Sequence, residues 1–198
     1  MLGEYEIGLF QSAAQSRELW DSVKTYLDLR HIFTDAKQRK EFEKKFARYY
    51  GLLAAGLTET WLEQYFKLLF DYKKTADSST YQDLLLKLYP YHRRKGDNVL
   101  QFSFVSKLVA FHDETRPLYD QRVRYFFGLG PPRAGSNEFK ISGFVQNLNE
   151  IALRYTRWTE EKRFTQILDQ MRERCPGLAA CHAIRLCDFL VHKAPSDS

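Results

Sequence analysis

Asp120 stands at the start of an aromatic segment, with three arginines around it. The stretch reads RPLYDQRVRYFFG over residues 116–128, and its basic residues are Arg116, Arg122 and Arg124. Asp is a leading N-cap residue and Pro favours helix starts, so capping alone explains this carboxylate. A carboxylate in that position is also suited to stabilising positive charge that develops in a reaction on a polyanion. The residue types leave both roles open, and the two roles are compatible.

A second basic cluster precedes this segment. PYHRRKGDN at residues 90–98 separates two helical stretches, 80–89 and 99–112. A hairpin between helices can aim backbone N–H groups at a phosphate, and the following helix adds its positive end. Such contacts bind the DNA backbone without reading its sequence. The residues expected to contact DNA are Arg93, Arg94, Lys95, Gly96, Asn98, Arg116, Arg122 and Arg124.

The segment 80–128 resembles the core of the helix-hairpin-helix DNA glycosylase superfamily. RPLYDQRV is similar to the family motif in which an Asp begins a helix and a Val or Ile follows three residues later, here Asp120 and Val123. The resemblance implies that Asp120 is catalytic, that DNA is the partner and that no cofactor is needed. The target nucleotide must then leave the base stack and enter a pocket. The aromatic residues proposed for this pocket are Tyr49, Tyr50, Trp61 and Tyr65.

The chain departs from the family pattern in two places. The family hairpin reads Leu-Pro-Gly-x-Gly, whereas RRKGDN contains Gly96 alone. Members that also cleave the DNA backbone carry a Lys about nineteen residues before the Asp, where this chain has Gln101. Lys107 lies thirteen residues before Asp120, more than a helical turn further along. Gln101, Lys107 and Asp120 are the candidate catalytic residues, and we expect a monofunctional glycosylase that uses water rather than an enzyme amine.

Several of these residues also have purely structural explanations. Asn98 and Gln101 stand at the spacing of a capping box, and Lys107 fits a solvated or snorkelling side chain. A metal site would need four converging ligands, for which the chain offers three cysteines and one histidine near its end: Cys175, Cys181, Cys187 and His182. Their spacing favours buried thiols, so no metal is expected.

Helical periodicity dominates the chain. The expected helices are 16–33, 35–57, 58–74, 80–89, 99–112, a short one after Asp120, 142–157, 160–173 and 178–192. The pattern predicts an all-α, compact multi-helix globule of about nine or ten helices with a helix-hairpin-helix-like element. We expect a single domain, 1–198. The Gly/Pro-rich loop 128–137 either divides two helical halves or merely connects two helices.

The composition narrows the partner. A net charge of +5 and a pI near 9.0 favour an anionic partner, and 15% aromatic residues suit base stacking as well as a core. We see no signal peptide and no apolar run of membrane-spanning length, and an odd number of cysteines, three, argues against a disulfide framework. These features predict a soluble, intracellular (cytoplasmic) protein, which we expect to be a monomer. A bacterial or phage-related host is suggested by the resemblance to the glycosylases.

Two functions follow from the sequence. The first is a monofunctional DNA glycosylase that flips out a damaged or modified base and hydrolyses its N-glycosidic bond with help from Asp120. Housekeeping repair and removal of a modified phage base, which would make this a defence protein, both remain open. The alternative is a non-catalytic, all-helical module that binds nucleic acid or protein and uses Asp120 only as a cap.

Overall fold

The computed structural model describes residues 2–72, 79–132 and 135–194, and within these ranges the chain forms helices and no strands. The ten α-helices are α1 (Glu4–Gln15), α2 (Arg17–Phe33), α3 (Arg39–Tyr49), α4 (Glu59–Asp71), α5 (Ser79–Leu88), α6 (Phe102–His112), α7 (Gln121–Phe126), α8 (Asn137–Thr159), α9 (Lys162–Arg174) and α10 (Ala183–Lys193). Three short 3-10 turns accompany them: η1 (Ala36–Gln38), η2 (Leu52–Ala54) and η3 (Pro176–Leu178). The all-α prediction is confirmed.

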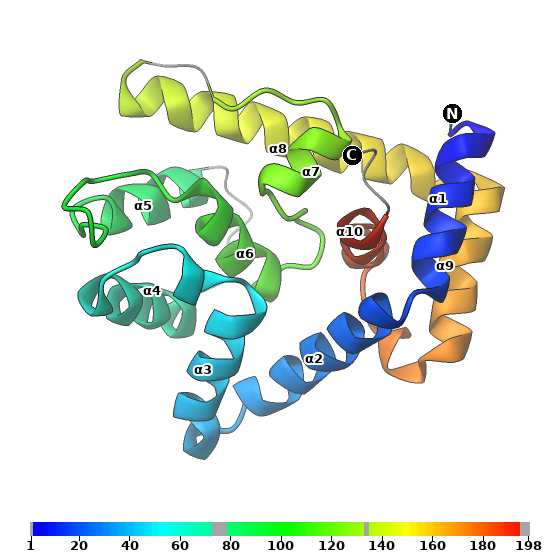
Figure 1. Cartoon of the computed structure of the whole chain (residues 1–198), viewed down its shortest axis with the longest axis horizontal. Helices are drawn as coiled ribbons and strands as arrows, with labels where there is room; N and C mark the ends of the chain where they lie inside the picture. The colour runs from blue at the N-terminus through cyan, green and yellow to red at the C-terminus, as the bar shows by residue number, and fades with distance from the viewer. Residues whose placement is uncertain (1, 73–78, 133–134, 195–198) are drawn as a thin grey trace.

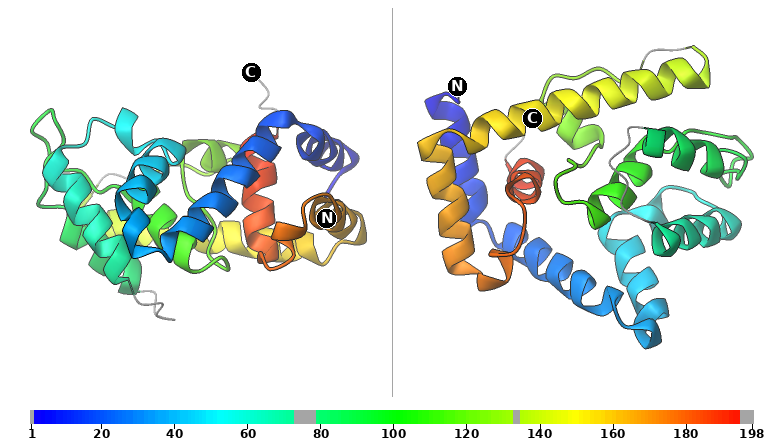
Figure 2. Two further views of the ribbon diagram at one scale, coloured as in Figure 1. Left: turned by 90° about the horizontal axis from the view of Figure 1, so that it is seen from below. Right: turned by 180° about the vertical axis from the view of Figure 1, so that it is seen from behind.

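Helix α10 lies in the middle of the molecule (Figure 1). Helices α1 and α9 lie on one side of it and α3 to α6 on the other, while α2 and α8 run along opposite edges (Figures 1 and 2). Helix α10 packs against α1, α2, α7 and α8, and every residue from Ile184 to Val191 is buried. A helix that is buried all round belongs to the core, so any polar residue on α10 needs a partner.

Side-chain caps fix three of the predicted helix starts. Ser16 accepts a hydrogen bond from the backbone N–H of Leu19, and Thr58 accepts one from Trp61. Asp120 caps α7 in the same way. Each cap satisfies an N–H group that has no partner within its own helix. These three helix starts are confirmed.

The continuous helix predicted over 35–57 is wrong. Helix α3 ends at Tyr49, and the chain then turns through Gly51, whose φ of +74° suits glycine alone. Because of this turn, the backbone carbonyl of Tyr50 leaves the helix and faces α6, where Lys107 uses it. Helix α1, which the pattern did not single out, packs on α2, α9 and α10.

The buried apolar side chains of α1 to α10 form one cluster. Near its centre, the ring of Phe111 lies edge-on to Phe33 and Phe46 at centroid distances of 5.2 and 5.4 Å. Such edge-to-face pairs add to the stabilisation that burial provides. None of the helices in the described ranges is long and apolar enough to cross a membrane.

The Gly/Pro-rich segment between α7 and α8 runs beside α8 where it is described. Asn147 donates to the carbonyl of Gly130 at 3.0 Å, and Arg154 donates to the carbonyl of Phe127 at 3.1 Å. Both donors belong to α8, so the segment is tied to the helix that follows it.

Candidate active site

Asp120 is held rigidly in front of α7. Its Oδ1 atom accepts a hydrogen bond from the backbone N–H of Val123 at 3.0 Å. The two residues before it are also fixed, because the N–H of Tyr119 donates to Ser106 on α6 and the N–H of Leu118 donates to Asp188 on α10. The cap therefore leaves Oδ2 as the carboxylate atom available for other contacts.

Lys107 brings its ammonium group to this free oxygen. Its Nζ lies 4.0 Å from Asp120 Oδ2 and donates to the carbonyl of Tyr50 at 3.2 Å and to Ser103 Oγ at 3.0 Å. Burial lowers the pKa of the ammonium, and the Asp120 carboxylate partly offsets that effect. The expectation that Lys107 is a solvated side chain is wrong, since it is buried beside Asp120.

His192, near the end of α10, completes the centre and was missed by sequence reasoning. Its Nε2 lies 3.3 Å from Asp120 Oδ2, but the contact lacks hydrogen-bond geometry and Nε2 has no hydrogen-bond partner among the described residues. Burial lowers the pKa of the imidazole, while the Asp120 carboxylate opposes this shift. Seventy residues separate His192 from the Asp120 motif, and no local signal in the sequence links them.

The three arginines around Asp120 in the sequence do not pair with it in the structure. Arg116 contacts Asp113 at 3.6 Å, and Arg122 donates to the carbonyl of Ala194 at 2.7 Å. Arg124 lies about 6 Å from the ring centroids of Tyr119 and Tyr125. The carboxylate instead faces a lysine and a histidine from other helices.

A buried ion pair on α10 lies next to the site. Arg185 and Asp188 on α10 are each about 1% exposed and lie 2.6 Å apart, and Arg185 also donates to the carbonyl of Ala110 at the end of α6. Burial raises the pKa of Asp188 to about 6, against the opposing charge of Arg185. Since Asp188 binds the N–H of Leu118, the pair ties α10 to the turn that carries Asp120.

Asp120 opens onto a cavity of about 320 Å³, which we call the inner cavity. Tyr49, Tyr50, Lys107 and His192 line it together with Asp120. Its volume is at the lower end of the range for small-ligand pockets, which suits one flat ring. Of the four aromatic residues predicted to form a base pocket, Tyr49 and Tyr50 line this cavity.

Trp61 and Tyr65 line neither the inner cavity nor any surface hollow beside Asp120, so the prediction that they form a base pocket is wrong. They are about 1% and 0% exposed, and their rings stack on each other at 5.2 Å inside the core. The hydroxyl of Tyr65 donates to the carbonyl of Phe104. The spacing along α4 turns both side chains inward, where the apolar stripe of an amphipathic helix must lie.

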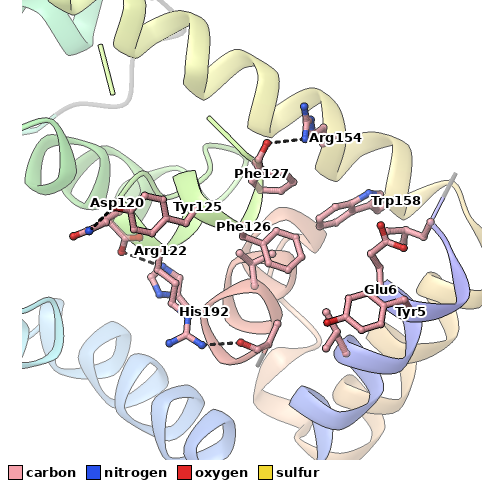
Figure 3. Close-up of a pocket in the computed structure, with 15 residues that line it drawn as sticks. Tyr5, Glu6, Asp120, Arg122, Tyr125, Phe126, Phe127, Arg154, Trp158 and His192 are labelled. Carbon is pink, nitrogen blue, oxygen red and sulfur yellow. Dashed lines mark hydrogen bonds and ion pairs between the residues drawn. The ribbon is translucent and has the colours of Figure 1, made fainter. Parts of the chain in front are cut away.

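A larger hollow of about 950 Å³ lies on the other side of Asp120, and we call it the outer groove. Figure 3 shows Tyr5 on α1 opposite Asp120 and Tyr125, with the rings of Phe126 and Trp158 between them. Asp120 and His192 line both hollows. The candidate centre therefore stands where the inner cavity and the outer groove meet.

In the 92–98 loop, which was expected to bind phosphate, most of the polar groups are hydrogen-bonded or ion-paired to other groups of the protein. Arg93 forms an ion pair with Asp97, and Arg94 donates from Nε to the carbonyl of Leu57. The backbone N–H groups of Arg93, Arg94 and Gly96 donate to carbonyl oxygens of the loop and of Gly56. These N–H groups are therefore not available to a phosphate, and the exposed cationic side chains of Arg94 and Lys95 are what the loop could still offer it.

The capping box predicted for Asn98 and Gln101 is also wrong. Asn98 donates to the carbonyl of Tyr89 and contacts His92, so it stabilises the loop. Gln101 occupies the N-cap position of α6, but its side chain makes no capping hydrogen bond. Neither residue lines the inner cavity or the outer groove, so the candidate catalytic role of Gln101 has no geometric support.

The three cysteines are free thiols, and Cys181 and Cys187 are buried. Burial raises the pKa of the Cys181 thiol to about 11, which makes it unreactive at neutral pH. Across residues 2–72, 79–132 and 135–194, no group of three or more His, Cys, Asp or Glu side chains could hold a metal ion.

Comparison with protein-family models, with curated proteins and with solved structures found no match to the chain. A function therefore has to be inferred from the geometry around Asp120.

Proposed function

We propose that the protein is a monofunctional DNA glycosylase that removes a damaged or modified base. The observation that supports this proposal is the convergence of Asp120, Lys107 and His192 on one cavity with Tyr49 and Tyr50 in its wall. The rings of Tyr49 and Tyr50 contact each other at a centroid distance of 4.7 Å, so a flipped base would pack against this pair and not between its rings.

The proposed reaction needs one carboxylate. The bond between the sugar C1′ and the base nitrogen breaks, and its electron pair leaves with the base. The Asp120 carboxylate stabilises the positive charge that develops on the sugar, in a setting where water is largely excluded. A water molecule then adds to C1′ and gives its proton to the carboxylate. Lys107 Nζ and His192 Nε2 both lie within 4.0 Å of Oδ2 of that carboxylate.

The defining experiment is base release from DNA. The protein is incubated with unmodified genomic DNA and with heavily modified phage DNA, and free bases are identified by mass spectrometry. We expect a released base from at least one of these DNAs and none with Asp120→Asn. Release from modified phage DNA alone would assign the protein to defence, whereas release from damaged host DNA would assign it to repair.

The nucleophile is tested in the same reaction. Because Lys107 lies beside Asp120 in a setting that lowers its pKa, an attack by its amine would give a covalent imine with the sugar. Borohydride reduces such an imine to a stable protein–DNA adduct. We expect base release without an adduct. An adduct that forms with the wild type and disappears in Lys107→Met would show that the nucleophile is the lysine amine and not water.

The second candidate, a non-catalytic binding module, is favoured by one observation. Asp120 caps α7 through Val123, so its presence is explained without chemistry. If no DNA releases a base while the protein binds DNA in a salt-sensitive way, this second function replaces the first.

A further inference from the structure

The outer groove carries the most exposed aromatic side chains of the described chain. Tyr125 on α7 and Tyr5 on α1 are 68% and 58% exposed, more than any other large hydrophobic residue in those ranges. Both line the same groove, although they come from helices far apart in the sequence. Single exposed aromatic residues are common on protein surfaces, but two that share one groove indicate a ligand site.

The ring of Tyr125 has two contacts with its own helix. The amide of Gln121 donates to the hydroxyl of Tyr125 at 2.9 Å, and the Arg124 guanidinium lies 5.8 Å from its ring centroid. The floor of the groove is equally fixed, because Trp158 stacks on Phe127 at a centroid distance of 5.2 Å. A rigid ring loses little conformational freedom when a flat ligand stacks on it.

The outer groove itself is lined by two cationic side chains, Arg122 and Arg154, and two anionic ones, Glu6 and Asp120, so the excess of positive charge lies in the adjoining inner cavity. The inner cavity and the outer groove together are lined by six cationic and three anionic side chains. The cationic ones are Arg48, Lys107, Arg122, Arg154, Arg185 and Lys193. Arg122 is exposed at the groove and uses one donor on Ala194, out of the five that a guanidinium carries. Flat rings joined by phosphates match this combination of aromatic faces and guanidinium groups.

We propose that the outer groove binds unpaired nucleotides of a DNA strand, with bases stacked on Tyr5 and Tyr125, next to the nucleotide held in the inner cavity. This rests on the proposed function only for the placement of the target nucleotide. The two hollows meet at Asp120 and His192, so a strand lying in the groove passes the candidate centre. Its volume of about 950 Å³ leaves room for more than one flat ring. The protein is thereby suited to DNA whose strands are locally separated.

Fluorescence anisotropy with a short, labelled oligothymidylate tests this proposal without requiring any base release. Tyr5→Ala and Tyr125→Ala each remove a ring on which a base stacks. Each should therefore lower the affinity by about 5- to 150-fold, which corresponds to the usual free energy of stacking one base on an aromatic ring. Tyr125→Phe keeps the ring and should bind as the wild type does. Phe139→Ala is the matched control, since Phe139 is 55% exposed on α8 and does not line the groove, and its affinity should not change.

The outcomes separate this inference from the proposed function. Failure of the wild-type protein to bind oligothymidylate, or equal binding by Tyr5→Ala, Tyr125→Ala and the wild type, would overturn the groove assignment even if base release is observed. Equal losses in Phe139→Ala and Tyr125→Ala would overturn it as well. Tyrosine-dependent binding in a protein that releases no base from any DNA would support the groove and refute the glycosylase.

Discussion

The inner cavity and the 92–98 loop are two polar regions that differ in where their interacting side chains come from. The cavity collects Tyr50, Lys107, Asp120 and His192 from four separate parts of the chain. The loop is basic over a few consecutive residues, and it lies at the end of α5 away from α10 (Figures 1 and 2). In the cavity the polar groups of Lys107 and His192 lie within 4.0 Å of Asp120, whereas in the loop Arg93 pairs with Asp97 and Arg94 donates to the carbonyl of Leu57.

This difference shows that charged residues clustered along the sequence are a weak indication of a functional site. Arg93 has Asp97 four residues away, and a flexible loop can close on such a partner at little cost. Asp120 also has arginines four residues away on both sides, Arg116 and Arg124, but neither pairs with it, and its ionic contacts come from α6 and α10. Charges that the fold brings together from distant segments are therefore the better guide to a site.

The sharpest test of the comparison is Asp120→Asn. Asn caps a helix as well as Asp does, so the free energy of unfolding should change little. Loss of the carboxylate should lower the rate of base release by about 100- to 10,000-fold, which is the usual contribution of a positioned acid–base group. Single-turnover release followed by mass spectrometry measures the rate, and urea denaturation measures the stability.

The loop supplies the control for this test. Asp97→Asn removes a carboxylate that pairs only with Arg93. It should leave base release unchanged. A similar loss of rate in both variants would show that the effect is not specific to Asp120. Unchanged release in Asp120→Asn would show that Asp120 is not a catalytic residue.

The next largest effect is expected from the buried pair beneath the cavity. Arg185→Met or Asp188→Leu alone leaves one charge buried without its partner and should cost about 3–5 kcal/mol of unfolding free energy. The double variant leaves no buried charge and should lose less than either single variant. Urea denaturation of the three proteins checks this, and equal or additive losses would contradict it.

A smaller effect concerns the pH response of His192. Its pKa should lie below the ordinary value of about 6.5, because burial disfavours the imidazolium. At this residue the folded state then binds fewer protons than the unfolded one just below that pH, so the contribution of His192 to stability should fall as the pH drops through about 6.5. NMR titration of the imidazole protons measures the pKa directly.

Asp120→Asn should lower the pKa of His192 further, since the carboxylate favours the imidazolium. His112 is the matched control. Burial lowers its pKa too, but its ring nitrogen bonds to the carbonyl of Leu69 and Asp120 does not act on it. A response of His112 equal to that of His192 would contradict the geometry.

The smallest effect is expected for the salt dependence of DNA binding. Arg48 and Lys193 line the inner cavity, and replacing either by Ala should reduce the salt slope of the affinity by about 1 if it contacts a phosphate. Arg93→Ala should reduce the slope by less, since Arg93 is already paired with Asp97. The reverse order would restore the loop as the main phosphate contact.

Much of the fold could be predicted because its signals are local. Apolar periodicity identified most helices, and the caps at Ser16, Thr58 and Asp120 lie where the residue types placed them. The break after α3 was missed, because Gly51 within a strongly periodic run is a weak signal until its positive φ is known.

The site was predicted only in part, for a physical reason. Asp120 and Lys107 lie on adjacent elements, but counting residues along α6 could not show that a long flexible side chain reaches across to the next turn. His192 joins them only because α10 packs against α7, and this packing is decided by the core as a whole. The aromatic residues of α4 were misassigned because stacking residues and core residues have the same composition.

The central place of α10 also affects how the protein is made. Arg185, Asp188 and His192 all lie on α10, which follows every other helix in the chain. While a ribosome is still synthesising the earlier helices, the turn that carries Asp120 lacks its anchor and the cavity lacks one wall. A nascent chain therefore cannot assemble the centre until α10 has emerged.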